Sequence, residues 1–299
     1  MLEATNQEEA WQGGDKPFVA SYGKLMMWFF LITDALTFSA FLASYGFSRF
    51  KYDTSWPVPE DVFTHFPFLH GDHPLLFVAL MTFILIMSSV TMVFAVNYGH
   101  AMKKNKVILW LVLTIIGGIT FLGSQAWEWG HFIHGDKGAI ITDNAEIIHI
   151  IKDKHIFSID KLMDFDTHSN HAHEINFDSL KSKFSKKSEL KLRLSDKTIL
   201  DHQDAIHYLD KHGAEIIRGA NLYKNEYGHP LFGDYFFFIT GFHGFHVFSG
   251  VILLIIILIN VIKDTYERRG HYEMIEKVGL YWHFVDLVWV FVFTFFYLV

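Results

Sequence analysis

The chain has 299 residues, of which 51% are hydrophobic and 17% are aromatic, including 31 Phe. Soluble domains are less apolar, so the composition indicates a membrane protein. The formal net charge of -7 argues against a nucleic-acid partner, and the absence of Cys excludes disulfides, Cys-ligated zinc, iron–sulfur clusters and a thiol nucleophile. The first 20 residues are acidic and polar and lack the features of a cleaved signal peptide, so we expect the first membrane helix to act as an uncleaved signal.

Long apolar runs predict five transmembrane helices, because roughly 20 apolar residues are needed to cross a hydrocarbon core. The expected spans are residues 24–47, 73–98, 107–133, 232–262 and 278–299. The sequence therefore predicts an all-α membrane protein with three helices in 1–134 and two in 231–299.

Basic residues in two short loops predict the orientation. These loops, after the second and fourth spans, hold Lys103, Lys104, Lys106, Lys263, Arg268, Arg269 and Lys277. The positive-inside rule assigns both to the cytoplasm. We therefore expect a cytoplasmic N-terminus, and a periplasmic C-terminus and 135–230 segment, in a bacterial inner membrane.

Residues 135–230 form a hydrophilic connection far too long for a helix–helix turn. EIIHIIKDKHIFSID predicts a hairpin, ELKLRLS a half-buried strand, and DHQDAIHYLDKHG a helix with Asp201 as N-cap and Gly213 as its stop. We expect a small α+β extramembrane domain. Its HSNHAHE stretch, 168–174, is a weak candidate for metal binding, and a solvated polar turn is favoured because no ligand spacing on a defined element supports the site.

Ionisable side chains inside a membrane span are costly, so each one here is a candidate functional residue. They are Asp34, Glu128, His243, His246, His283 and Asp286. The pairs Gln125/Glu128, His243/His246 and His283/Asp286 are spaced i, i+3 and therefore share helix faces. We favour a buried polar network that fixes helix packing, with Gly241, Gly244 and Gly250 allowing close approach of backbones.

Asp34 leaves two interpretations open. No basic residue lies near it in sequence, so it is a candidate proton carrier. It is equally a candidate for a protonated carboxyl that hydrogen-bonds Thr33, Thr37 or a neighbouring helix.

Redox and metal sites in the membrane are the main rivals of the packing interpretation. A heme with two His ligands needs facing His residues at matching depth, and His243 or His246 with His283 offers one pair at most. A di-metal carboxylate site needs paired Glu-x-x-His motifs, whereas Glu128 and His131 form the one such motif in the spans. A membrane cytochrome b remains the alternative from another functional class.

Four stretches together resemble subunit III of the heme–copper oxidases. YFFFITGFHGFHVFSG and GLYWHFVDLVWVFVFTFFYLV in the last two spans carry the most specific likeness, and WFFLITDALTFSAFLASY and ITFLGSQAWEW resemble the first and third helices of the five-helix bacterial form. The resemblance implies a five-helix bundle with a V-shaped lipid cleft and no heme or copper of its own. It implies packing against subunit I, near subunit II, in a proton-pumping terminal oxidase whose partner subunits hold the heme and copper. It also implies bound phospholipids and support of subunit I stability and proton uptake.

The resemblance carries residue roles with it. It implies that His243 and His246 belong to buried packing, that Glu128 matches the family's buried Glu, and that Asp34 stands where many cytochrome c oxidases have Glu and quinol-oxidizing relatives often have Asp. We expect a cytochrome c oxidase, with a quinol oxidase as the alternative.

The 135–230 domain is absent from ordinary family members. Its 16 acidic and 14 basic residues are nearly balanced, which argues against a strong electrostatic patch for a basic cytochrome. We expect a docking or assembly element, packed within a larger assembly such as a respiratory supercomplex or touching a cytochrome c domain.

Overall fold

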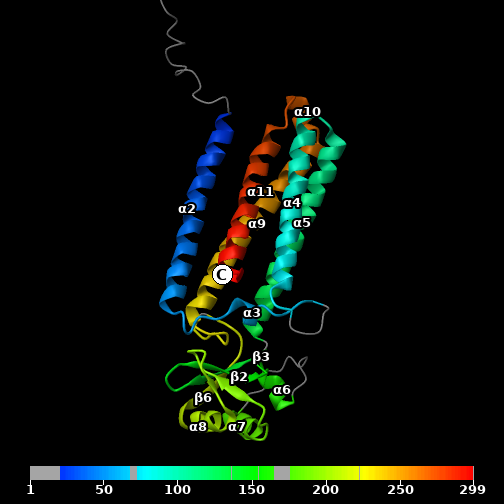
Figure 1. Ribbon diagram of the computed structural model, residues 1–299. Coiled ribbons are helices and arrows are strands. Elements are labelled where there is room, and N and C mark those ends of the chain that lie inside the picture. The colour runs from blue at the N-terminus through cyan, green and yellow to red at the C-terminus, as the bar shows by residue number, and fades with distance from the viewer. Residues whose placement is uncertain are drawn as a thin grey trace, which may run out of the picture.

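A computed structural model describes residues 21–67, 73–135, 137–153, 155–164, 176–221 and 223–298. Five long helices form a bundle, and a smaller domain of strands and short helices lies at one end of it (Figure 1). The bundle helices are α2 (Tyr22–Lys51), α4 (Leu76–His100), α5 (Lys104–His134), α9 (Pro230–Ile262) and α11 (Glu273–Val292), which a π-helix, η1 (Phe293–Leu298), continues. All five are long and apolar enough to cross a membrane, which confirms the expected all-α membrane fold.

Several helices are longer than their apolar spans and begin or end with polar residues or Pro. Ser21 caps α2 by accepting from the Lys24 backbone N–H, and the basic residues Arg49 and Lys51 lie in its last turn. His229 caps α9, whose first residue is Pro230, a good helix-starting residue because it lacks an N–H to satisfy. The helices therefore reach into the polar regions that flank the membrane.

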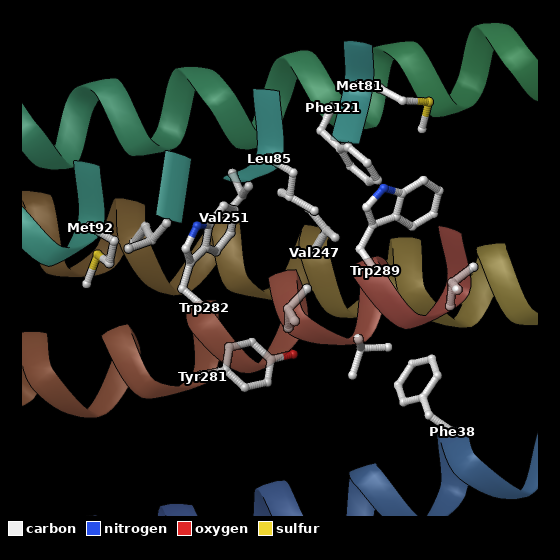
Figure 2. Close-up of a cluster of buried hydrophobic side chains, with 14 of the residues drawn as sticks. Phe38, Met81, Leu85, Met92, Phe121, Val247, Val251, Tyr281, Trp282 and Trp289 are labelled. Carbon is white, nitrogen blue, oxygen red and sulfur yellow. The ribbon is translucent and has the colours of Figure 1, made fainter. Parts of the chain in front are cut away.

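Helix α11 lies at the centre of the bundle and contacts α2, α4 and α9, while α5 packs between α4 and α9. Figure 2 shows Trp282 and Trp289 projecting from α11 among side chains of the neighbouring helices. Their indole N–H groups donate to Ser88 Oγ (3.1 Å) and Thr82 Oγ1 (2.9 Å) of α4. These large rings bury apolar area and satisfy their polar atom at once, which fixes α11 against α4.

Helix α2 lies at the edge of the bundle, where it packs against α9 and α11 (Figure 1). Its buried side chains are Leu31, Phe38 and Tyr45, whereas most of its other apolar side chains are exposed. Between α2 and α11 lies an apolar groove of about 740 Å³, with Phe47, Phe50, Phe291 and Phe295 in its wall. The V-shaped cleft itself stays a prediction.

The smaller domain, here called the insert, connects α5 to α9. Its antiparallel sheet has the strand order β5-β4-β2-β1-β6, with β3 paired to β2 off this path. The strands are β1 (Ala139–Thr142), β2 (Ile147–Lys152), β3 (His155–Ile156), β4 (Lys191–Arg193), β5 (Ile199–Leu200) and β6 (Gly213–Ile217). The helices α6 (Ile159–Met163), α7 (Phe177–Ser185) and α8 (His202–His212) share a core with this sheet, which includes Ile148, Leu180, Phe184, Leu192 and Leu209. The short helices α3 (Pro59–Val62) and α10 (Thr265–Arg269) lie in loops of the bundle.

The strands and helix expected in the insert are present. β2 and β3 form the hairpin, Ile151 facing Ile156, and β4 lies in the alternating stretch with Leu192 as its buried residue. Helix α8 begins after Asp201 and ends at His212, where Gly213 starts β6 directly. The HSNHAHE stretch lies outside the described residues.

Candidate functional site

The intramembrane polar residues lie in several separate contacts between helices. Asp34 of α2 and His246 of α9 form one of them, with Asp34 Oδ2 3.4 Å from His246 Nε2. Both side chains are largely buried, at 16% and 9% exposed. His246 Nδ1 lies 2.8 Å from the Phe242 carbonyl, which can only accept, so Nδ1 carries a proton. Asp34 Oδ2 has no hydrogen-bond partner among the described residues, so its contact with His246 is an ion-pair contact rather than a formed hydrogen bond.

The two threonines beside Asp34 are engaged elsewhere. Thr33 Oγ1 donates to the Phe30 carbonyl (2.7 Å) and Thr37 Oγ1 to the Thr33 carbonyl (3.0 Å). Such back-bonding is the usual way a hydroxyl is satisfied inside a helix. His246, from a different helix, is therefore an ionisable neighbour of Asp34.

His243 is fully buried and faces α11. Its Nε2 donates to the Val285 carbonyl (3.1 Å), and its ring contacts Phe121 and Trp289. A residue that ligated heme through Nε2 would give up this hydrogen bond. Through the hydrogen bond to Val285 and the ring contact with Trp289, His243 joins α9 to α11.

His283 and Asp286 lie on the side of α11 that faces α4. His283 Nδ1 and Ser89 Oγ are 2.6 Å apart. Asp286 is 9% exposed, and its Oδ1 has no hydrogen-bond partner among the described residues. This pair therefore adds a polar contact between α11 and α4.

Glu128 of α5 belongs to a fourth cluster. Its Oε2 accepts from Gln125 Nε2 (3.0 Å) and from the Tyr297 hydroxyl (3.1 Å). Tyr297 lies in η1, so this cluster ties the C-terminal turn of the chain to α5. Tyr297 and Ser89 were not foreseen, because a neutral hydroxyl gives no charge or periodicity signal in an apolar span.

The i, i+3 pairs thus lie at contacts between helices. They do not join into one hydrogen-bonded network among the described residues. No hydrogen bond that the described residues form links the Gln125/Glu128 pair to either histidine-containing pair. Gly241 and Gly250 lie at close contacts, since a Cβ there would be 3.0 Å from Trp129 and Trp282 respectively. A Cβ at Gly244 would meet nothing within 4 Å, so Gly244 does not lie at a close helix contact within this chain.

Within the ranges that the structure describes, no three His, Asp or Glu side chains are grouped to hold a metal ion.

A further polar cluster joins the insert to the bundle. His149 of β2 is buried, and its Nε2 donates to the Glu226 carbonyl (2.7 Å). Burial holds the pKa of His149 at about 4, well below its ordinary value of 6.5, and the nearby Arg193 adds to this effect. Arg193 of β4 pairs with Asp61 of α3 (2.8 Å), so two neighbouring strands reach segments at the insert end of the bundle.

The entry and exit of the insert lie side by side. The Ala220 backbone N–H donates to the Phe132 carbonyl (3.0 Å), and the Gly219 N–H donates to Glu226 Oε2 (2.5 Å). Gly219 has a positive φ of 65°, and a Cβ there would lie 1.9 Å from the Ile133 carbonyl oxygen. Only glycine permits this crossing.

A family match in comparison with known proteins covers α9 and α11. A family model described as cytochrome c oxidase subunit III matches residues 225–299. "Cytochrome c oxidase subunit 3" of Rhipicephalus sanguineus is 46% identical over 67 residues, 22% of this chain and 26% of that protein. The protein of the same name from Marchantia polymorpha is 45% identical over 64 residues, 21% of this chain and 24% of that protein.

Another match covers a larger share of the chain. "Probable quinol oxidase subunit 3" of Staphylococcus saprophyticus is 22% identical over 222 residues, 74% of this chain and 66% of that protein. By contrast, the chain spans about a quarter of the length of the first curated relatives it matches.

Proposed function

We propose that the chain belongs to the subunit III family of the heme–copper oxidases and is the accessory subunit of a proton-pumping cytochrome c oxidase. The observation that carries the proposal is the match over residues 225–299. These residues form α9, α11 and η1, which hold His243, His246, His283 and Asp286. The chain acts by packing against subunit I, with subunit II nearby, while the heme and copper reside in those partners.

The proposed supporting role has two parts in this chain. The apolar groove between α2 and α11 offers a surface for the acyl chains of phospholipids, because its wall consists mostly of Phe, Leu, Val and Ala side chains. The contact between Asp34 and His246 offers a place where one proton can be held at the edge of the bundle. We therefore propose that α2 retains lipid through this groove and supplies protons to subunit I through Asp34.

A quinol oxidase is the second candidate. It is favoured by the longest match described above, to a protein whose name carries that activity. Both candidates give this chain the same non-catalytic part and differ in the electron donor of the complex.

The orientation proposed is a cytoplasmic N-terminus, with the C-terminus and the insert in the periplasm of a bacterial inner membrane. Lys103, Lys104, Arg268 and Arg269 support it, because they lie at the end of the bundle opposite to the insert (Figure 1). The chain has no Cys, so single cysteines at Ser182 and Lys103 can be compared with a membrane-impermeant thiol reagent on whole cells. Labelling at Ser182 alone is expected, and labelling at Lys103 alone would reverse the orientation.

The insert is proposed as a docking or assembly element for a neighbouring protein, such as a cytochrome c domain or another respiratory complex. Its near-balanced charge supports a packed contact over a purely electrostatic one. Its firm attachment to the bundle through His149 and Arg193 supports a fixed position for that contact.

One purification tests the central proposal. A tagged chain is extracted in mild detergent with its complex, the visible spectrum is recorded, and oxygen consumption is measured with reduced cytochrome c and with a quinol. The spectrum is then repeated on the chain stripped of its partners. Heme in the complex, a colourless stripped chain and turnover with cytochrome c are expected. Turnover with quinol alone would select the second candidate, and a heme band in the stripped chain would contradict the accessory role.

A further inference from the structure

A small, partly enclosed cavity of about 20 Å³ lies where the insert end of α5 meets the segment that follows α3. Glu128, His131 and Trp127 of α5 form one side of it, and His65 and Tyr227 are also in its wall. A cavity of this volume has room for one water molecule, and a buried water normally needs two to four polar partners. The polar groups in this wall can supply them.

One carboxyl oxygen of Glu128 lacks a hydrogen-bond partner at this cavity. The side chain is 5% exposed, and its Oε1 has no hydrogen-bond partner among the described residues, whereas Oε2 accepts from both Gln125 and Tyr297. A carboxyl oxygen needs a partner in either protonation state, as a donor when it carries the proton and as an acceptor when it does not. Buried polar atoms are rarely left without a hydrogen bond, so we expect Oε1 to bind a small polar ligand.

His131 is placed to hold the same ligand. Its Nδ1 lies 3.2 Å from the Trp127 carbonyl, which can only accept, so Nδ1 carries a proton and Nε2 of the neutral ring has a free lone pair. The His131 and His65 rings are 5.3 Å apart, and both side chains are half-buried. The imidazoles therefore lie between the buried carboxyl and the insert end of the bundle.

We propose that this cavity binds one water molecule between Glu128 Oε1 and His131, and that Glu128 is thereby a proton-exchange site open to the insert end of the bundle. On release, the carboxyl proton passes to the water, the water passes one of its own protons to His131 Nε2, and the imidazolium gives a proton to solvent. The carboxylate keeps its two donors at Oε2, Gln125 and Tyr297.

Few of the described groups around Glu128 can take part in this proton transfer. The titratable neighbours are His131 on its own helix, His65 from the segment after α3, Tyr227 from the segment before α9, and Tyr297 of η1. Helix α4 contributes the apolar Phe77 and Val78. The site is separate from the Asp34–His246 contact and does not depend on the proposed oxidase function.

Infrared spectroscopy of the purified full chain tests the proposal. The C=O stretch of a protonated carboxyl is followed as the pH is lowered and after transfer into D2O, and the Glu128→Gln, Asp34→Asn and Asp286→Asn variants assign the bands. A band that only Glu128→Gln removes is expected to shift within the mixing time in the wild-type chain. His131→Phe is expected to slow this exchange by about 100-fold or more, the scale of a lost acid–base group.

His134→Phe is the matched control, because His134 lies three residues further along the same helix and is exposed. It is expected to leave the exchange rate unchanged. Val78→Leu, which fills the cavity from α4 without removing a titratable group, is expected to slow exchange even if His131→Phe does not fold. Equal rates in wild type and both cavity variants, the lack of any Glu128-dependent band, or a high-resolution map with no water in the cavity would each overturn the proposal.

Discussion

His149 is the buried imidazole at the junction of the insert and the bundle. Its pKa of about 4 in the folded chain lies below the ordinary 6.5 because burial disfavours the charged ring. The unfolded chain therefore binds more protons between these two values, so the stabilisation is complete above pH 6.5 and is lost as the pH falls toward 4. The difference corresponds to on the order of 3 kcal/mol.

We expect the insert to become susceptible to protease as the pH is lowered through this window. His149→Asn should remove most of the pH dependence while making the insert less stable at neutral pH. His207→Asn, at an exposed position on α8, should behave as wild type. Limited proteolysis over a pH series measures this, and an unchanged pH dependence in His149→Asn would show that another group is responsible.

Asp34 permits a second prediction at this scale. If its contact with His246 holds a proton for the oxidase, Asp34→Asn should slow proton uptake and steady-state turnover of the complex by about tenfold or more, whereas Asp34→Glu should retain most of the rate. Stopped-flow proton uptake by the purified complex measures it. Equal rates in Asp34→Asn and wild type would leave the residue a purely structural role.

The sequence located the ionisable residues inside the spans, because hydropathy makes each one conspicuous. It did not reveal their partners. His246 is 212 positions from Asp34 in the chain, and Ser89 and Tyr297 are ordinary residues in an apolar helix. Such contacts depend on how the helices rotate against one another, and spacing along a single helix does not determine that rotation.

At the scale of the elements, a glycine of α5 sets how closely three helices approach. A Cβ at Gly118 would lie 2.6 Å from the Trp282 ring and 2.8 Å from Val251. Gly118→Ala should therefore lower the free energy of unfolding by about 1–3 kcal/mol, because overpacking forces rings off their preferred rotamers. Unfolding in mixed detergent measures the change.

Gly123 in the same helix is the control, since a Cβ there meets nothing within 4 Å. Gly123→Ala should be neutral or slightly stabilising, as Ala favours a helix over Gly by about 1 kcal/mol. Equal losses in the two variants would mean that helix flexibility, rather than the contact with Trp282, explains the Gly118 result.

The elements themselves were largely predictable. Apolar runs identified all five spans, and alternation and charged turns identified the β2–β3 hairpin, β4 and α8. The π-helix η1 was not predictable, because its residues, FTFFYL, fit an ordinary membrane helix equally well. The π-helix holds Tyr297, whose hydroxyl lies beside Glu128.

At the scale of the whole molecule, the insert should be removable. Phe132 and Ala220 are joined by a backbone hydrogen bond, so the two ends of the insert already lie together. A chain in which a short Gly linker replaces residues 136–218 should keep its five helices and its place in the complex. It should lose binding only to whatever docks on the insert.

Heme content and turnover of the purified complex, with a list of co-purifying proteins, measure the effect of this deletion. The matched control is Arg193→Ala, which keeps the insert but removes its ion pair with Asp61. Loss of the bundle fold in the deleted chain would mean that the insert is part of the structural core. An unchanged set of partners would contradict the docking role.

The insert also has a consequence for how the chain is made. Helix α5 packs against α9, yet roughly 95 residues separate His134 from Pro230. At a synthesis rate of about 5–20 residues per second, α5 waits on the order of 5 to 20 s in the membrane before its neighbour emerges. During this interval its buried polar face, with Gln125 and Glu128, has neither α9 nor Tyr297 to cover it. The nascent three-helix intermediate is therefore the stage at which an insertase or a partner subunit would protect this chain most.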